Sequence, residues 1–294
     1  MSTLLSEFIH HFTSTEKGGK LRQLIDESWD TIPRNNEIQA LKSYLFDKGV
    51  GVDFLNSTVA PLLNSSTFHV KFAGVFCHKK PTIQRTAASI AANPGDTPGC
   101  ELGDLLTLFV LLDSANKLHH LSGSLFQAKV KPKLDSLSQR HLYDNDLEFK
   151  LPANLGAHTR RMPTFDEGRG RALRYLILNP DSPNKYVSCR HTPWGADYQH
   201  RWSTYIYNLL AGNEGLPARL ANSKSQTSWE IIVDDLLGVA AKVPKQKPAR
   251  GTDIAVKIAT AQFNSFLSSE VQCIQTEEPG ISILMIIAHK HIES

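Results

Sequence analysis

Residues 100–133, CELGDLLTLFVLLDSANKLHHLSGSLFQAKVKPK, decide the fold of this chain. The first apolar run, 105–112, is long and apolar enough for a strand that is buried on both faces. The polar residues 113–117 are typical of a turn, and a second run follows that ends near Val130. The stretch therefore predicts a β-hairpin in the centre of a sheet.

Three polar side chains lie where the two predicted strands leave the core. Asp104 precedes the first run, and Gln127 and Lys129 stand near the end of the second. Strand side chains alternate between faces, so Gln127 and Lys129 share one face, and Asp104 lies beside them if the strands pair. Taking such groups out of water costs free energy, which indicates a functional site.

These side chains suit metal-assisted hydrolysis of a phosphodiester. Mg²⁺, or Mn²⁺ in its place, prefers oxygen ligands. Asp104 offers a carboxylate, while Gln127 and the Ala128 backbone offer carbonyl oxygens. A bound metal polarises the phosphate and lowers the pKa of a water ligand. Lys129 would orient that water or offset the charge that develops on the phosphate.

Gly103-Asp104, followed by Gln127-Ala128-Lys129 on the neighbouring strand, resembles the motif of the PD-(D/E)XK nuclease superfamily. The Q-x-K form is similar to that of Mrr-like type IV restriction endonucleases. The resemblance implies a Mg²⁺-dependent nuclease that hydrolyses DNA, in restriction or in defence against foreign DNA. Two positions depart from the usual motif: no proline precedes Asp104, and Gln127 stands where an acidic residue is commoner.

The core of that family has the order αβββαβ, which the predicted elements from 34 to 179 match. The resemblance thus implies an α/β fold with a mixed central sheet and a restriction-endonuclease-like core at 67–180. We expect a helical N-terminal segment at 1–66 that includes the first core helix, and a helix at 134–143 after Lys129. The remaining residues are expected to form an α+β C-terminal extension packed on the core, at 181–294, with helices at 198–210, 228–241 and 253–267 and a terminal hairpin of 271–275 and 281–288.

Asp104 and Gln127 alone make a weak metal site, so a further carboxylate is expected. Glu101 is one candidate, but strict alternation puts it on the opposite face from Asp104 unless the strand start is bulged. Glu37, on the helix before the first core strand, is the other candidate. An acidic side chain from that helix sometimes completes the site in the family that the chain resembles.

Two other pairs imitate parts of the motif. Gly95-Asp96 lies in a proline-bearing loop with no strand after it. Glu148 and Lys150 alternate with apolar residues, which is typical of an exposed strand whose charges face water. The alternative for Asp104 and its neighbours is likewise the solvated end of an edge hairpin.

Basic residues supply candidate phosphate contacts. The individual candidates are His78, Lys131, Lys133, Arg140, Arg160 and Arg161. Further clusters contain Arg169, Arg171, Arg174, Lys242, Lys245, Lys247 and Arg250. Neutralising several phosphates gives salt-sensitive, largely sequence-independent binding to nucleic acid, here expected to be DNA.

The overall composition limits the possible functions but does not identify one. The 294 residues are 41% hydrophobic and 21% charged with a net charge of +3, which argues neither for nor against nucleic acid. The four cysteines form no C-x-x-C pair, as expected for reduced thiols. We see no signal peptide and no apolar run long enough to span a bilayer, so a cytoplasmic protein with no membrane association is expected.

Two other functions remain open. Gln127 could mark a catalytically inactive nuclease-like module that binds nucleic acid or a protein partner. The chain could instead be an interaction or scaffold protein in which the apolar run 281–288 packs at a homodimer interface. A partner protein of a defence system is the other possible partner.

Overall fold

The structure is a computed structural model. It describes residues 3–14, 18–79, 81–153, 157–179, 186–195, 198–218, 227–240 and 274–291, with the backbone alone at 78, 79, 238–240 and 274–279. The predicted helix at 253–267 lies outside the described residues. None of the helices among the described residues has the length and apolar character needed to cross a membrane.

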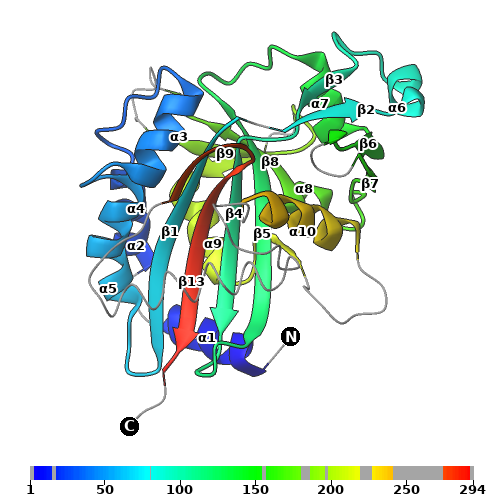
Figure 1. Cartoon of the computed structure of the whole chain (residues 1–294). Coiled ribbons are helices and arrows are strands. Elements are labelled where there is room, and N and C mark those ends of the chain that lie inside the picture. Colours follow the sequence, from blue (N-terminus) through cyan, green and yellow to red (C-terminus); the bar gives the residue numbers. More distant parts are fainter. Residues whose placement is uncertain are drawn as a thin grey trace.

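A large mixed sheet occupies the centre of the molecule (Figure 1). Among the described residues its strand order is β10-β9-β8-β5-β4-β13-β1-β12, and β11 also pairs with β5. The strands are β1 (Phe68–Lys79), β4 (Leu105–Leu112), β5 (Leu118–Lys129), β8 (Leu173–Ile177), β9 (Ser188–His191), β10 (Gln199–Arg201), β11 (Leu216–Pro217), β12 (Ile274–Pro279) and β13 (Ser282–Lys290). Parallel and antiparallel pairs coexist, so the predicted α/β class is confirmed.

The predicted central hairpin is present as β4 and β5. All eight residues of β4 are buried, as expected for a strand covered on both faces. Leu105 of β4 pairs with Phe126 of β5, and Leu112 with Leu118 beside the turn. The ends of the two strands that lie away from this turn form the open end of the hairpin.

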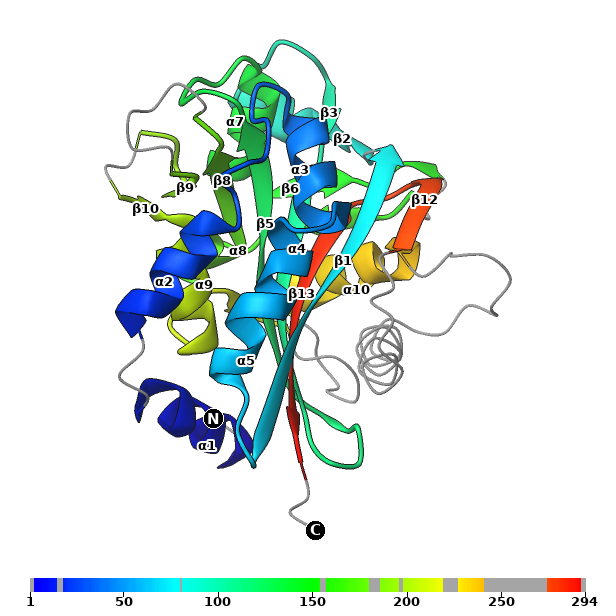
Figure 2. The ribbon, with the colours of Figure 1, turned by 90° about the vertical axis from the view of Figure 1, so that its left-hand side faces the viewer.

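Helices cover both faces of the sheet, which Figure 2 shows from its side. One core layer joins the sheet to α1 (Thr3–Ser14), α2 (Gly18–Glu27), α3 (Glu37–Phe46), α4 (Gly51–Phe54), the π-helical turn η1 (Leu55–Val59), α5 (Ala60–Leu63) and α9 (Trp202–Leu210). The other joins it to α7 (Leu137–Asp144), α8 (Arg169–Ala172) and α10 (Ser228–Ala240). Asn36 caps α3, with its side chain accepting from the Gln39 backbone N–H.

A second, small sheet lies beside α7 and was not predicted as a sheet. Its strand order is β3-β2-β6-β7, with β2 (Thr82–Arg85), β3 (Gly99–Glu101), β6 (Glu148–Lys150) and β7 (Thr159–Arg161), and α6 (Ala87–Ala92) follows β2. A strand of three or four residues has too few alternating polar and apolar positions to be recognised in the sequence. The exception is β6, which was expected as an exposed strand. Ile83 and Phe149 are fully buried and anchor this sheet to the core.

The C-terminal residues are not an extension packed on a finished core. β13 lies in the middle of the large sheet, antiparallel to β1 and parallel to β4. β12 pairs with the other edge of β1, so β12 and β13 flank β1 and do not form the predicted hairpin. Residues 282–289 are buried, because an uninterrupted apolar strand needs neighbours on both edges and cover on both faces.

Two predictions change with this topology. The division of the chain at 180 is wrong for the sheet, since β13 separates β1 from β4 within the expected core. The 281–288 run is unavailable as a dimer interface because it is already buried inside the chain. The predicted helix at 198–210 also begins later, at Trp202, because residues 199–201 form β10.

Candidate active site at the open end of the β4–β5 hairpin

Asp104 lies against the main chain of β5. Its backbone N–H donates to the Phe126 carbonyl at 2.8 Å, which extends the β4–β5 ladder by one residue. Its carboxylate Oδ2 accepts the backbone N–H of Ala128 at 2.7 Å. The carboxylate, only 3% exposed, is therefore held at the peptide between Gln127 and Lys129. The structure brings these three residues together at the open end of the hairpin.

The Gln127 side chain presents an oxygen at the same place. Gln127 is fully buried, and its Nε2 donates to the Glu101 carbonyl at 3.0 Å. Its Oε1 has no hydrogen-bond partner among the described residues. A buried carbonyl oxygen left without a donor costs about 1–3 kcal/mol. A hard cation at Oε1 would remove that cost, so the residues present fit a Mg²⁺ or Mn²⁺ ion.

Lys129 is fixed by a residue that the sequence did not single out. Lys129 is 9% exposed, and its Nζ donates to Oε1 of Gln139 at 2.9 Å. Gln139 lies in the first turn of α7, whose cap is the Ser136 side chain. The S-x-x-Q spacing of Ser136 and Gln139 is that of a capping box, which would have placed Gln139 one turn into the helix after Lys129.

Close packing holds the turn before Asp104. A Cβ built on Gly103 would lie 2.7 Å from Leu125 Cδ1 and 2.9 Å from the Tyr143 hydroxyl, so a larger residue does not fit. The Tyr143 hydroxyl donates to the Leu102 carbonyl at 3.0 Å. Burial, and then the negative charge of Asp104, raise the pKa of Tyr143 well above its usual value. The phenol therefore stays protonated and keeps donating this hydrogen bond.

A second carboxylate reaches the site from α3. Oε1 of Glu37 accepts the backbone N–H of Val130 at 3.1 Å. The Ala128 and Val130 amides, two residues apart on one strand, are separated by about 6.6 Å. Asp104 and Glu37 therefore bind successive outward amides of β5, beyond the start of β4. Glu37 is therefore a second acidic group at the strand end that carries Gln127 and Lys129.

Glu101 contributes in a different way from the one expected. It ends β3 of the small sheet, where it pairs with Thr82, and so does not lie on a bulged start of β4. Its backbone carbonyl orients the Gln127 amide, and its side chain is half-buried. The carboxylate of Glu37, by contrast, contacts the site strand directly through the Val130 backbone N–H.

The two pairs that imitate parts of the motif, Gly95-Asp96 and Glu148 with Lys150, make other contacts in the structure. Asp96 accepts the backbone N–H of Ser138 at 2.9 Å at the start of α7. Hydrogen bonding from the side chain of Ser138, and then from its backbone, lowers the pKa of Asp96 to about 2. Glu148 and Lys150 are exposed on β6, as the alternation predicted.

The predicted phosphate contacts divide into exposed lysines and arginines held in ion pairs. Lys131 and Lys133 are exposed just beyond Lys129, and Lys133 lies 3.8 Å from Asp135. Arg160 is held by Asp235 in a two-point contact. Arg161 pairs with Glu167, and Arg140 lies 3.5 Å from Asp144. The side chain of His78 and the whole of the Lys242–Arg250 group, at 242–250, lie outside the described residues.

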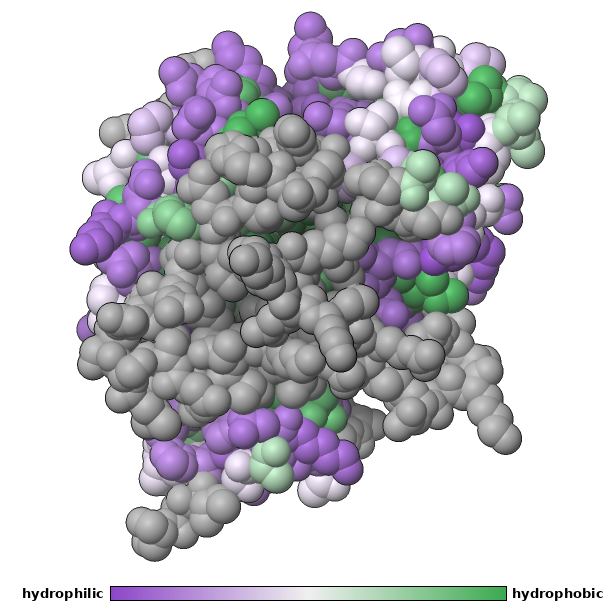
Figure 3. Space-filling view, viewed as in Figure 1, coloured by the Kyte–Doolittle hydropathy of each residue, from purple (hydrophilic) through white to green (hydrophobic). Residues whose placement is uncertain are grey.

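Two arginines of the predicted basic clusters cannot reach a phosphate. Arg169 is 1% exposed and donates to the Pro163 and Asp146 carbonyls at 2.6 and 2.7 Å. Arg174 is fully buried and pairs with Glu214. Their charges are used in contacts inside the protein. Clustering in the sequence alone could not distinguish such buried arginines from arginines on the surface. The upper end of the face seen in Figure 3 nevertheless carries many hydrophilic residues among those described.

Comparison of the chain with protein-family models, with curated proteins and with solved structures finds no match.

Proposed function

We propose that this chain is a Mg²⁺-dependent nuclease that hydrolyses DNA phosphodiester bonds. The observation that carries the proposal is the hydrogen bond from Ala128 N–H to Asp104, which gathers a carboxylate, a buried amide oxygen and a buried ammonium within one strand end. The resemblance to type IV restriction enzymes extends the proposal to foreign DNA as the substrate.

Each residue has a role that follows from its contacts. Asp104 and Oε1 of Gln127 would hold the ion, and Glu37 would hold one of its waters. When bound, the ion polarises the scissile phosphate and acidifies a water. Lys129, oriented by Gln139, faces the charge that develops on the phosphate. Glu101 and Tyr143 keep the site rigid through main-chain contacts, which limits reorganisation during the reaction.

The exposed lysines beyond β5 supply a path for the substrate backbone. Lys131 and Lys133 continue from Lys129 without an intervening element, so a phosphate chain bound by them would pass the strand end that carries Asp104. Such contacts position a nucleic acid without reading its sequence, and binding should weaken as salt is raised.

A second function has one observation in its favour. Gln127 is neutral where a carboxylate would bind Mg²⁺ more strongly, so the chain could bind nucleic acid without cleaving it. Metal binding separates the two functions: a binding module needs no Mg²⁺ or Mn²⁺ at Asp104, even with DNA present.

The direct experiment is cleavage of supercoiled plasmid by the purified full chain with Mg²⁺, with Mn²⁺ and with EDTA. We expect metal-dependent cleavage that falls by about 10²–10³-fold in Lys129→Met. Lys117→Met, in the exposed turn at the other end of the same hairpin, is the matched control and should cleave normally. Full metal-dependent cleavage by Lys129→Met or by Asp104→Asn would reject the proposal.

A further inference from the structure

Two histidines and a glutamate converge on the face of the sheet opposite Asp104. Arg174 of β8 pairs in register with Phe126, and the ring of Phe126 belongs to the core layer that contains α9. The next residue of β8, Tyr175, pairs with Gln127 and therefore faces the other side of the sheet. His191 of β9 lies directly across from Arg174. His200 of the edge strand β10 and Glu214, after α9, complete a cluster that the nuclease proposal does not use.

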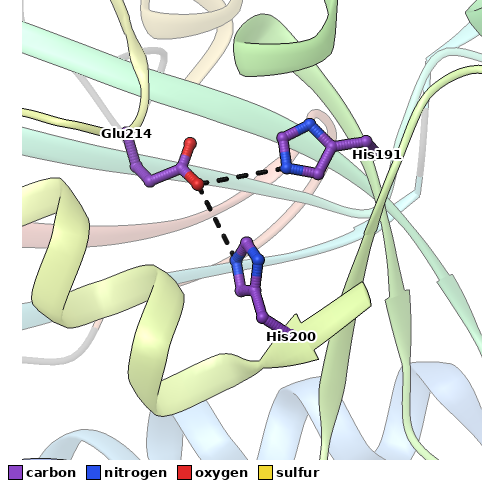
Figure 4. Close-up of side chains that lie close together, drawn as sticks. All are labelled: His191, His200 and Glu214. Carbon is purple, nitrogen blue, oxygen red and sulfur yellow. Dashed lines mark ion pairs between the residues drawn. The ribbon is translucent and has the colours of Figure 1, made fainter. Parts of the chain in front are cut away.

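The three side chains point toward one another, as Figure 4 shows. Oε1 of Glu214 lies 4.0 Å from Nε2 of His191 and 3.9 Å from Nε2 of His200. These separations are too long for hydrogen bonds. The three facing atoms all lie within 4.8 Å of one another. Two atoms that ligate one tetrahedral zinc ion at about 2.1 Å lie about 3.4 Å apart, so the three side chains would each move inward by about half an ångström when an ion binds.

His191 turns its Nε2 toward the carboxylate of Glu214. Nδ1 of the ring lies beside Gly170, and Nε2 has no hydrogen-bond partner among the described residues. With the proton on Nδ1, the lone pair of Nε2 faces a carboxylate oxygen, an unfavourable arrangement unless a cation lies between them.

We propose that His191, His200 and Glu214 form a binding site for a divalent transition-metal ion of the zinc type. Arg174 and the ion would share the carboxylate: Arg174 pairs with Oε2, and Oε1 remains directed at the histidines. Arg174 also lies 3.5 Å from Nε2 of His200, so its charge weakens the site relative to one without a neighbouring cation. Two nitrogens and one oxygen favour Zn²⁺ over Mg²⁺, with a water in the fourth position.

Such an ion would stabilise the edge of the large sheet. It would join β9 and β10 to the segment after α9 through three bonds. Tyr198, 56% exposed, packs its ring against both histidines, with centroid distances of 4.5 and 5.3 Å, so the cluster lies directly beneath the surface and an ion can enter.

The test is calorimetric titration of Zn²⁺ into metal-free Asp104→Asn chain, in which the candidate nuclease site lacks its principal carboxylate. We expect one equivalent to bind and the melting temperature to rise. Adding His191→Gln or His200→Gln should weaken binding at least tenfold and remove the rise in melting temperature. His158→Gln, which changes an exposed histidine, is the control and should bind as before.

Melting curves recorded in EDTA show whether each variant is folded, so a folding defect cannot be mistaken for a lost ligand. Cobalt in place of zinc gives a second readout, because its visible absorption reports coordination by imidazole. The absence of Zn²⁺ and Co²⁺ binding, or equal affinity with His191→Gln, would overturn the proposal and leave Arg174 as the permanent partner of Glu214.

Discussion

The Asp104 carboxylate accepts the Ala128 backbone N–H at 2.7 Å, although 24 residues separate them in the chain. The contact is made one residue before β4 begins, where β5 continues without its neighbour. The Asp104 side chain thus accepts the hydrogen bond that the backbone of a neighbouring strand would otherwise accept. This contact places a charged group beside Gln127 and Lys129.

Gln139 should act as a positioning residue for Lys129. Gln139→Leu removes the acceptor of the Lys129 ammonium, and we expect kcat for DNA cleavage to fall about tenfold while KM is unchanged. Gln139→Glu keeps an acceptor at the same position and should restore most of the activity. Steady-state kinetics on a short duplex measure both constants. An unchanged kcat in Gln139→Leu would show that Lys129 needs no such support.

Glu37 rather than Glu101 should be the second acidic group for the metal. Glu37→Gln removes the charge that lies beside Val130, so we expect cleavage to require a higher Mg²⁺ concentration. Glu101→Gln changes a side chain while keeping the backbone carbonyl that binds Gln127, and it should shift the Mg²⁺ dependence less. Mg²⁺ titrations of the two variants decide the question, and the reverse order of effects would favour Glu101.

Gly103 is expected to tolerate no side chain. In Gly103→Ala the new methyl would press on Leu125 and on the Tyr143 hydroxyl, and we expect a loss of about 1–3 kcal/mol in the free energy of unfolding. Gly19→Ala is the matched control, because nothing lies within 4 Å of its Cβ position in α2. It should leave stability unchanged or raise it by up to about 1 kcal/mol. Denaturant titration measures both, and equal stability of the two variants would contradict the packing described for Gly103.

Acid should destabilise the metal-free chain through its buried histidines. Burial, followed by the charge of Arg171, lowers the pKa of His120 from 6.5 to about 4. Unfolding then takes up protons between about pH 6.5 and pH 4, so the stability present above this range is lost as the pH falls through it. At pH 5 the loss from one such histidine is at most about 2 kcal/mol.

His120→Gln should reduce this loss. Melting temperatures in EDTA at about pH 7.5 and pH 5 should differ less in His120→Gln than in the unchanged chain. A difference of the same size in both would mean that His120 does not contribute to the acid sensitivity.

The central part of the fold could be predicted from local pattern, and the rest depended on distant pairing. The fully apolar run of β4 and the polar turn after it identified the hairpin, since both signals are local. The 281–288 run was equally visible, but its place between β1 and β4 depends on pairing across more than 170 residues, which local sequence does not encode. β2 and β3 were missed because each is too short to show a period.

The candidate site also contains residues that could be predicted from local sequence and residues that could not. Gln127 and Lys129 could be assigned to one face by alternation, and Asp104 followed from the hairpin register. Gln139 and Glu37 reach the site from helices on opposite sides of the sheet, so their participation depends on how α7 and α3 pack. His191, His200 and Glu214 come from two short strands and a loop, and no spacing in the sequence relates them.

The most direct test of the account is a crystal structure of the chain soaked with Mn²⁺, with anomalous scattering used to locate the ion. We expect an anomalous peak within coordination distance of the Asp104 carboxylate and Oε1 of Gln127, and its loss in crystals of Asp104→Asn. A well-ordered open end of the β4–β5 hairpin with no Mn²⁺ bound beside Asp104 would contradict it.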